Sequence, residues 1–261
     1  MQPHAGLLRA RVGRYPWRVL ADALNLTTTL NELSAGLCTA PEAEARIRGS
    51  RIHHVADLDG VLGLDPLHLV ALRLALARTE TRFAQTQWLL LLPRAGRLGG
   101  LRGPADVTSL ALDAGAIVLA SDGRLGWIPL AVGPAIQWRL VRAERPMVPP
   151  SPREAAGAFA AVLAEEGAGL ASLGVRAGRR PRIECLALPA GYPARSASLL
   201  ERASVVLAAA SAGLDAQTEI VTSHSVLGRE LHLRRLADAA LDAVSAAASW
   251  PSWAMESEPS R

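Results

Sequence analysis

The chain has 261 residues, of which 50% are hydrophobic and 20% are charged, and this balance excludes a largely disordered chain and a fibrous repeat. All 28 basic residues are arginine, so chemistry that needs a lysine amine, such as a Schiff base or a P-loop lysine, is excluded. The net charge of +4 is too small to indicate a dense nucleic-acid-binding stripe by itself.

Cysteine usage and the N-terminal sequence favour a cytoplasmic protein. Cys38 and Cys185 have no histidine or second cysteine at metal-ligand spacing, which fits a reducing compartment. The N-terminal segment lacks the apolar stretch and cleavage site of a signal peptide. The apolar run over 88–92 is too short to cross a bilayer. We therefore expect neither export nor a membrane-spanning segment.

The chain begins with a basic aromatic arm, followed by two predicted helices. Residues 1–20 carry four arginines and no acid, and this arm either packs its rings on the protein body or lies on a phosphate backbone. Helical spacing predicts a helix over 17–37. A second helix is predicted from Asp65 as cap and Pro66 in its first turn to about Arg78. Its apolar face consists of Leu67, Val70, Leu74 and Ala77.

The middle of the chain has the period of strands. Apolar runs over 88–92 and 116–120 predict strands that are covered on both faces. Asp122-Gly123 predicts a type I′ turn into a strand over 125–131, and Gly133-Pro134 predicts the next turn. Ile136, Trp138 and Leu140 then alternate with Gln137 and Arg139, as in a strand with one packed and one wet face. We predict an antiparallel meander over about 85–143.

A proline-rich strap over 146–152 is the predicted boundary between a mixed α/β N-terminal region, 1–145, and a helical C-terminal region, 153–250. Ser151 and Glu154 predict a capping box for the first C-terminal helix, and Ser198 with Glu201 predicts one for the second. A third helix is predicted over 225–249, and residues 251–261 are predicted to be a disordered tail. The expected fold class is α+β: an antiparallel meander with helices, followed by an all-helical bundle.

The segment VADLDGVLGL, residues 55–64, resembles the first motif of the haloacid-dehalogenase-like phosphohydrolases, in which an apolar strand ends in D-x-D-x-[T/V]. The resemblance implies that Asp57 is a nucleophile accepting a phosphoryl group, that Asp59 is its acid/base, and that Mg²⁺ neutralises the phosphate. The alternative interpretation is a turn at Asp59-Gly60. His53 and His54 next to these acids show no third ligand at suitable spacing, so we predict no metal site there.

The segment PRAGRLGGLRGP, residues 93–104, is the most informative candidate site. It contains no acid, follows a predicted strand and opens a short helix near Pro104. Glycines let backbone amides turn toward an anion, and arginine forks clamp phosphate or carboxylate. The alternative is a mobile connection that needs positive φ at several positions. The predicted binding residues, including a flanking surface on the last strand, are Arg94, Arg97, Gly99, Gly100, Arg102, Gly103, Trp138 and Arg139.

This loop, together with Gly133-Pro134, Gln137-Trp138-Arg139 and Gly191-Tyr192-Pro193, resembles the layout of an actinobacterial family of uncharacterised proteins, over about residues 85–250. The resemblance implies cytoplasmic residence in a GC-rich bacterium and supplies no activity. We therefore expect a non-catalytic cytoplasmic binding or regulatory protein that uses no cofactor and engages an anionic protein, nucleotide or nucleic-acid partner through the loop. The alternative is an Mg²⁺-dependent phosphohydrolase that uses Asp57 and Asp59.

Overall fold

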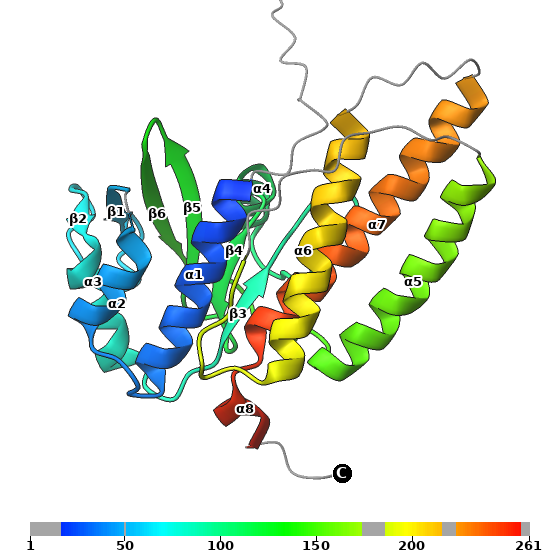
Figure 1. Ribbon diagram of the computed structural model, residues 1–261. Coiled ribbons are helices and arrows are strands. Elements are labelled where there is room, and N and C mark those ends of the chain that lie inside the picture. The colour runs from blue at the N-terminus through cyan, green and yellow to red at the C-terminus, as the bar shows by residue number, and fades with distance from the viewer. Residues whose placement is uncertain (1–16, 50, 174–185, 216–222, 257–261) are drawn as a thin grey trace, which may run out of the picture.

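Four of the six strands form the predicted antiparallel meander, and three long helices stand beside the sheet (Figure 1). The structure is a computed structural model that describes residues 17–49, 51–173, 186–215 and 223–256. The strands are β1 (His53–Ala56), β2 (Val70–Ala71), β3 (Trp88–Leu91), β4 (Ile117–Ala120), β5 (Gly126–Val132) and β6 (Ala135–Val141). The helices are α1 (Trp17–Ser34), α2 (Ala40–Arg48), α3 (Leu72–Arg82), α4 (Ala105–Ala114), α5 (Pro152–Ser172), α6 (Ala194–Asp215), α7 (Ser223–Ser249) and α8 (Ser252–Glu256). The α+β class is confirmed.

The meander follows the order β6-β5-β4-β3. The apolar runs of β3 and β4 explain why these two strands are buried on both faces. Every residue of β3 and β4 is buried, as their continuous apolar sequences predicted. Helix α4 covers one face, and helices α1 and α7 contribute to the core on the other (Figure 1). The β4–β5 turn is not type I′, because only Gly123 has positive φ and Asp122 does not. Gly133, with φ 57°, fits the β5–β6 hairpin as predicted.

The sheet is mixed rather than purely antiparallel. Residues His53–Ala56 form β1, which pairs in parallel with β6, and the short strand β2 pairs with β1 at the sheet edge. His53 and His54 therefore both belong to a strand of the sheet. His53 points into the core, where its Nδ1 accepts a hydrogen bond from Trp138 Nε1 at 3.0 Å. This contact satisfies one ring nitrogen of the buried histidine, whereas Nε2 has no hydrogen-bond partner among the described residues.

Among the N-terminal helices, two boundaries differ from the sequence prediction and one helix was not predicted. Helix α1 ends at Ser34 instead of residue 37, and α2 was not predicted, although Thr39 and Glu42 form a capping box at its start. Helix α3 begins at Leu72, because Asp65 caps only a local turn by accepting a hydrogen bond from the Leu67 N–H at 2.9 Å. Leu67 is 86% exposed and therefore belongs to no packed face.

In the C-terminal part, the capping box at Ser151 and Glu154 is confirmed, and so is the buried apolar face of α7, with Leu233, Leu236, Ala240 and Val244. Helix α6 begins at Ala194, not at Ser198, because Pro193 precedes it directly. Helix α8 occupies part of the predicted disordered tail, and residues 257–261 lie outside the described residues. By length and composition α6 is apolar enough to cross a membrane, but a helix packed in a core passes the same test.

The outer edge of β3 is covered by side chains from two helices instead of a further strand. The Trp88 N–H donates to Asn31 Oδ1 at 2.8 Å, and Asn31 Nδ2 donates to the Trp88 carbonyl at 3.1 Å. One step along, the Leu90 N–H donates to Ser249 Oγ at 3.0 Å, and Ser245 Oγ donates to the Leu90 carbonyl. Asn31 belongs to α1 and both serines belong to α7, so the edge is fully paired at these two residues.

The same edge contact joins the N-terminal and C-terminal parts of the chain. Asn31 Nδ2 also donates to the Tyr192 hydroxyl at 2.9 Å, and this hydroxyl donates to the Ala248 carbonyl at 2.9 Å. A single hydrophobic cluster accordingly contains residues of α1, of the sheet and of the C-terminal helices. The proline-rich strap therefore connects two regions that share one core.

We expect Asn31→Ala to lower the free energy of unfolding by about 3 kcal/mol, because it leaves the buried N–H and C=O of Trp88 without partners. Asn25→Ala on the same helix is the matched control, since Asn25 makes only an exposed hydrogen bond to the Arg46 carbonyl. Urea denaturation of the two variants checks this expectation. Equal losses in both would show that the β3 edge does not depend on Asn31.

Candidate functional site

The arginine- and glycine-rich loop after β3 is folded tightly against the strap. Arg94 and Arg97 close its first turn by reciprocal backbone hydrogen bonds of 2.8 Å. The Met147 N–H then donates to the Gly100 carbonyl at 2.9 Å, and a Cβ on Gly100 would lie 2.7 Å from the Met147 carbonyl oxygen. Gly100 has φ 90°, so both its conformation and its contact require glycine. The expected need for positive φ in this loop is confirmed.

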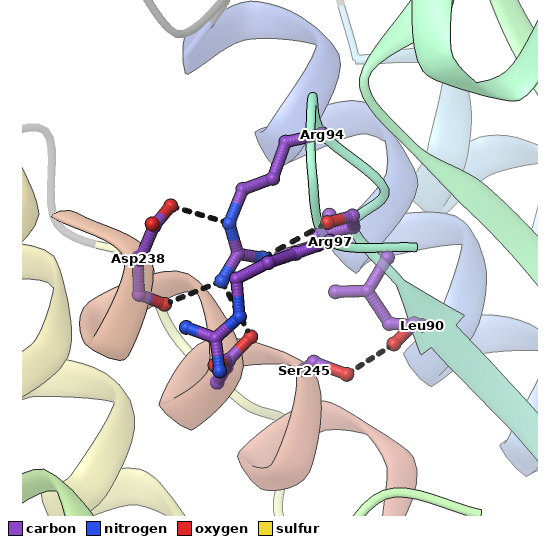
Figure 2. Close-up of polar contacts among 7 residues, drawn as sticks. Leu90, Arg94, Arg97, Asp238 and Ser245 are labelled. Atoms are coloured by element: carbon purple, nitrogen blue, oxygen red, sulfur yellow. Dashed lines mark hydrogen bonds and ion pairs between the residues drawn. The ribbon is translucent and has the colours of Figure 1, made fainter. Parts of the chain in front are cut away.

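Arg94 ties the end of β3 to helix α7 and is not free for a ligand (Figure 2). Its guanidinium donates from Nε to a carboxylate oxygen of Asp238, from Nη2 to Asp242 Oδ1 at 2.8 Å, and from Nη1 to the Leu92 carbonyl at 3.2 Å. The Arg94 side chain is only 13% exposed. Arg94 therefore has a structural role and not the predicted contact with a ligand, because its guanidinium already donates to Asp238, Asp242 and the Leu92 carbonyl.

The predicted flank formed by Trp138 and Arg139 does not lie beside the loop. Trp138 is completely buried, so it offers no surface to a partner. Arg139 pairs with Asp59 at 3.2 Å. Both residues lie on β6, which is three strand spacings from β3, or roughly 14 Å across the sheet. Sequence order suggested proximity, but the strand order separates these residues from the loop.

Arg97 and Arg102 remain exposed arginines of the loop. Arg97 has a 54% exposed side chain, and its Nη2 lies 3.2 Å from Asp242 Oδ2. Arg102 is exposed, and no side-chain ion pair of Arg102 is present among the described residues. Gly103 has φ 151°, and a Cβ there would lie 3.3 Å from the Glu144 nitrogen, so Gly103 serves the close approach of the loop to the segment that precedes the strap.

Arg97, Gly99 and Gly100 line a cavity of about 620 Å³, which the sequence did not predict. The other walls come from the strap, from one face of α5 and from one face of α7. This volume lies in the usual range of small-molecule sites. The spacing of small and apolar residues along α5 was the sequence feature that could have indicated the cavity, but a helix that packs against another helix has the same spacing. The main apolar wall residues are Leu92, Leu98, Met147, Val148, Pro149, Ala155, Ala158, Phe159, Val162, Ala239 and Ala243.

One end of the cavity is polar and is organised around Glu166. Glu166 is 3% exposed, and its two carboxylate oxygens contact His232 Nδ1 and Arg235 Nη1, the latter at 3.2 Å. Burial by itself raises the pKa of Glu166, but the hydrogen bonds from His232 and Arg235 outweigh it and hold the pKa below its usual value. Glu166 is therefore an ionised and already paired group.

Asp57 and Asp59 do not form the arrangement that a phosphohydrolase needs. Asp57 is 1% exposed, and its carboxylate accepts the N–H groups of Val61 at 2.6 Å and of Leu62 and Leu64 at 3.0 Å. Asp59 faces Arg139 instead. Both acids are thus engaged with different partners, so they do not fit an Mg²⁺ site, and the carboxylate of Asp57 organises its own loop.

Several sequence candidates lie outside the described residues, among them Cys185 and residues 1–16 of the basic arm, whose role stays a prediction. Cys38 is buried, and burial raises the pKa of its thiol to about 11. No group of three or more metal-ligating side chains is present in the described ranges.

The fold and the cavity define an α+β protein with a site at the junction of its sheet and its helical bundle. Residues 24–155 match the family model described as Rv1486c-like protein, N-terminal domain, and the chain belongs to this family. The family is named after a mycobacterial protein, which agrees with the resemblance to an actinobacterial family, whereas nothing supports the phosphohydrolase resemblance. No curated protein and no solved structure matches the chain. The matched region supplies the loop and the strap, and α7 lies beyond it.

We expect the protein to lose stability in mild acid, because the pKa of His53 is lowered in the folded state. Burial, followed by the nearby charges of Arg51 and Arg48, lowers its pKa from the ordinary 6.5 to about 4. Between pH 6.5 and 4, His53 is therefore protonated in the unfolded chain but not in the folded chain. The free energy of unfolding decreases as the pH falls through this range. His53→Asn, which keeps an acceptor for Trp138, should flatten this slope in urea denaturation measured from pH 7 to pH 4. An unchanged slope would contradict the assignment.

Asp57→Asn should lower the free energy of unfolding by about 2 kcal/mol, because an amide nitrogen replaces one of the oxygens that accept three buried N–H groups. Asp59→Asn is the matched control and should change stability by no more than about 0.5 kcal/mol, because the Asp59 side chain is 56% exposed. Thermal and urea unfolding measure both effects. A stable Asp57→Asn protein would argue against the structural role of this carboxylate.

Proposed function

We propose that this is a non-catalytic cytoplasmic binding protein that engages an anionic ligand or partner through the loop at Arg97 and Arg102. The observation that carries the proposal is the unequal use of hydrogen-bonding groups around the cavity. Asp242 and Glu166 each have both oxygens engaged by the chain itself. Arg97, in contrast, uses one nitrogen for Asp242, although a guanidinium carries five N–H donors. The unused donors favour an acceptor-rich, anionic group.

The state of the cavity carboxylates supports a binding role over catalysis. A general base needs a carboxylate that can reach a substrate proton. Glu166 is held by His232 and Arg235, and Asp238 and Asp242 are held by Arg94. Both oxygens of Glu166 and of Asp242 and one oxygen of Asp238 are occupied, which supports a site that positions a charged group without reacting with it.

Binding of the fluorescent anion 8-anilinonaphthalene-1-sulfonate tests the proposal, because this probe combines one charge with apolar rings. We expect Arg97→Gln to weaken binding about tenfold, the size of one lost charged hydrogen bond, and Arg102→Gln to weaken it less. Arg202→Gln on α6 is the matched control, because Arg202 is exposed and does not line the cavity. Equal affinities in all three variants and the parent would overturn the proposal.

The salt dependence of the same interaction distinguishes the kinds of partner. If the partner is a nucleic acid, affinity for a single-stranded oligonucleotide falls steeply with salt, and Arg97→Gln and Arg102→Gln each reduce the slope. If the ligand is a small anion, the oligonucleotide does not compete with the fluorescent probe.

A further inference from the structure

We infer that the ligand of the cavity is a small amphipathic carboxylate, with an aliphatic chain and a single negative charge, as in a medium-chain fatty acid. This inference rests on the proposed function and identifies the chemical class of its ligand. Three properties of the cavity carry it: the apolar length of its walls, the balance of charges around it, and the way in which Arg97 is held.

The walls form an elongated apolar groove. The residues of α5 that line it recur from Ala155 to Glu166, on one face of the helix, which spans about 16 Å at the rise of an α-helix. Phe159 and Val162 lie between these ends, opposite Ala239 and Ala243 of α7. The small alanine side chains leave the space open. Such a groove suits an extended aliphatic chain, because most of the residues that line it are apolar.

The rim of the groove is unusually apolar for a surface. Leu98 of the loop is 43% exposed, and Met147 and Val148 of the strap are 58% and 44% exposed. All three residues line the cavity. An aliphatic chain lying between the loop and the strap would cover them, and their burial would add to its affinity.

The charges around the cavity favour a ligand with one negative charge. Of the residues that line the cavity, Arg97 and Arg235 are positive and Glu166, Asp238 and Asp242 are negative. Arg94, which does not line the cavity, binds Asp238 and Asp242 and brings this set of six groups to zero. A nucleotide or another polyanion would bring several negative charges close to three carboxylates, which is unfavourable. A single carboxylate needs only one guanidinium that can turn toward it.

Arg97 is the guanidinium that can turn without leaving a buried charge unpaired. If Arg97 rotates from Asp242 to a ligand, Asp242 keeps its 2.8 Å contact with Arg94, and Figure 2 shows Arg97 beside Arg94 above α7. Arg235 differs, because it holds Glu166, which is 4% exposed at the side chain. Moving Arg235 would remove a charged partner from a buried carboxylate. The ligand carboxylate therefore binds Arg97, and its chain lies against Phe159 and the strap.

Displacement of the fluorescent anion by propionate, hexanoate, octanoate and decanoate, each below its micelle concentration, tests the inference on the full chain. We expect affinity to rise about fourfold for each added methylene until the groove is filled. Octyl phosphate, with its greater charge, should bind no more tightly than a carboxylate of equal chain length. 1-Octanol should bind more weakly than octanoate.

Two variants separate the contribution of the ligand's carboxylate from that of its aliphatic chain. Arg97→Gln should weaken octanoate about tenfold and leave 1-octanol unchanged. Ala158→Trp fills the groove from an exposed helix position and should weaken octanoate and 1-octanol alike, while unfolding curves confirm that the variant is folded. Arg202→Gln again serves as the control.

The outcomes distinguish this inference from the proposed function. Anion binding that depends on Arg97 but not on chain length would overturn the amphipathic ligand and leave the proposed function standing. Tighter binding of octyl phosphate than of octanoate would overturn the inference that the ligand carries a single negative charge. Equal affinities of the parent and of Arg97→Gln for every carboxylate in the series would overturn both the carboxylate contact and the proposed function.

Discussion

The outer edge of β3, which no further strand of the sheet covers, sets the main requirement for how the helices pack around the sheet. An edge strand presents N–H and C=O groups that must be paired or solvated, yet β3 is completely buried. Asn31 from α1, together with Ser245 and Ser249 from α7, supplies the missing partners. Each of these side chains must hold its position to within hydrogen-bond distance. The two helices are therefore placed by the polar requirements of one strand as well as by apolar packing.

Arg94 extends this pairing one residue beyond the strand, and in doing so it creates the geometry of the cavity. Its bond to the Leu92 carbonyl continues the edge, and its bonds to Asp238 and Asp242 anchor the loop on α7. With the loop held there and the strap hydrogen-bonded to Gly100, the space between them and α5 remains open as a cavity whose walls include several alanines and glycines. Arg94, which was predicted to bind a ligand, instead holds the loop in place beside the cavity. Arg97 of the same loop retains N–H donors that a ligand can use.

Most other buried polar groups in the described structure are also committed to the fold. Asp57 closes a loop through three N–H groups, His53 accepts from Trp138, and Glu166 joins α5 to α7. Polar groups that look catalytic in a sequence are used here to satisfy donors and acceptors in the interior. Residual hydrogen-bonding capacity, rather than residue type, is what singles out the surface around Arg97.

The class of fold, the meander, the strap and the capping box of α5 could be predicted from the sequence, because these depend on local period, turn residues and helix caps. The glycine-rich loop could be singled out in the same way, since Gly100 tolerates a backbone conformation and a contact that other residues do not. That Trp138 and Arg139 lie across the sheet, and that Asp238 and Asp242 neutralise Arg94, became evident only from the three-dimensional arrangement of the strands and helices. Those pairings join residues more than 140 positions apart or follow from strand order, and no local pattern encodes either. The cavity likewise depends on three separated segments meeting, and its position follows from long-range packing.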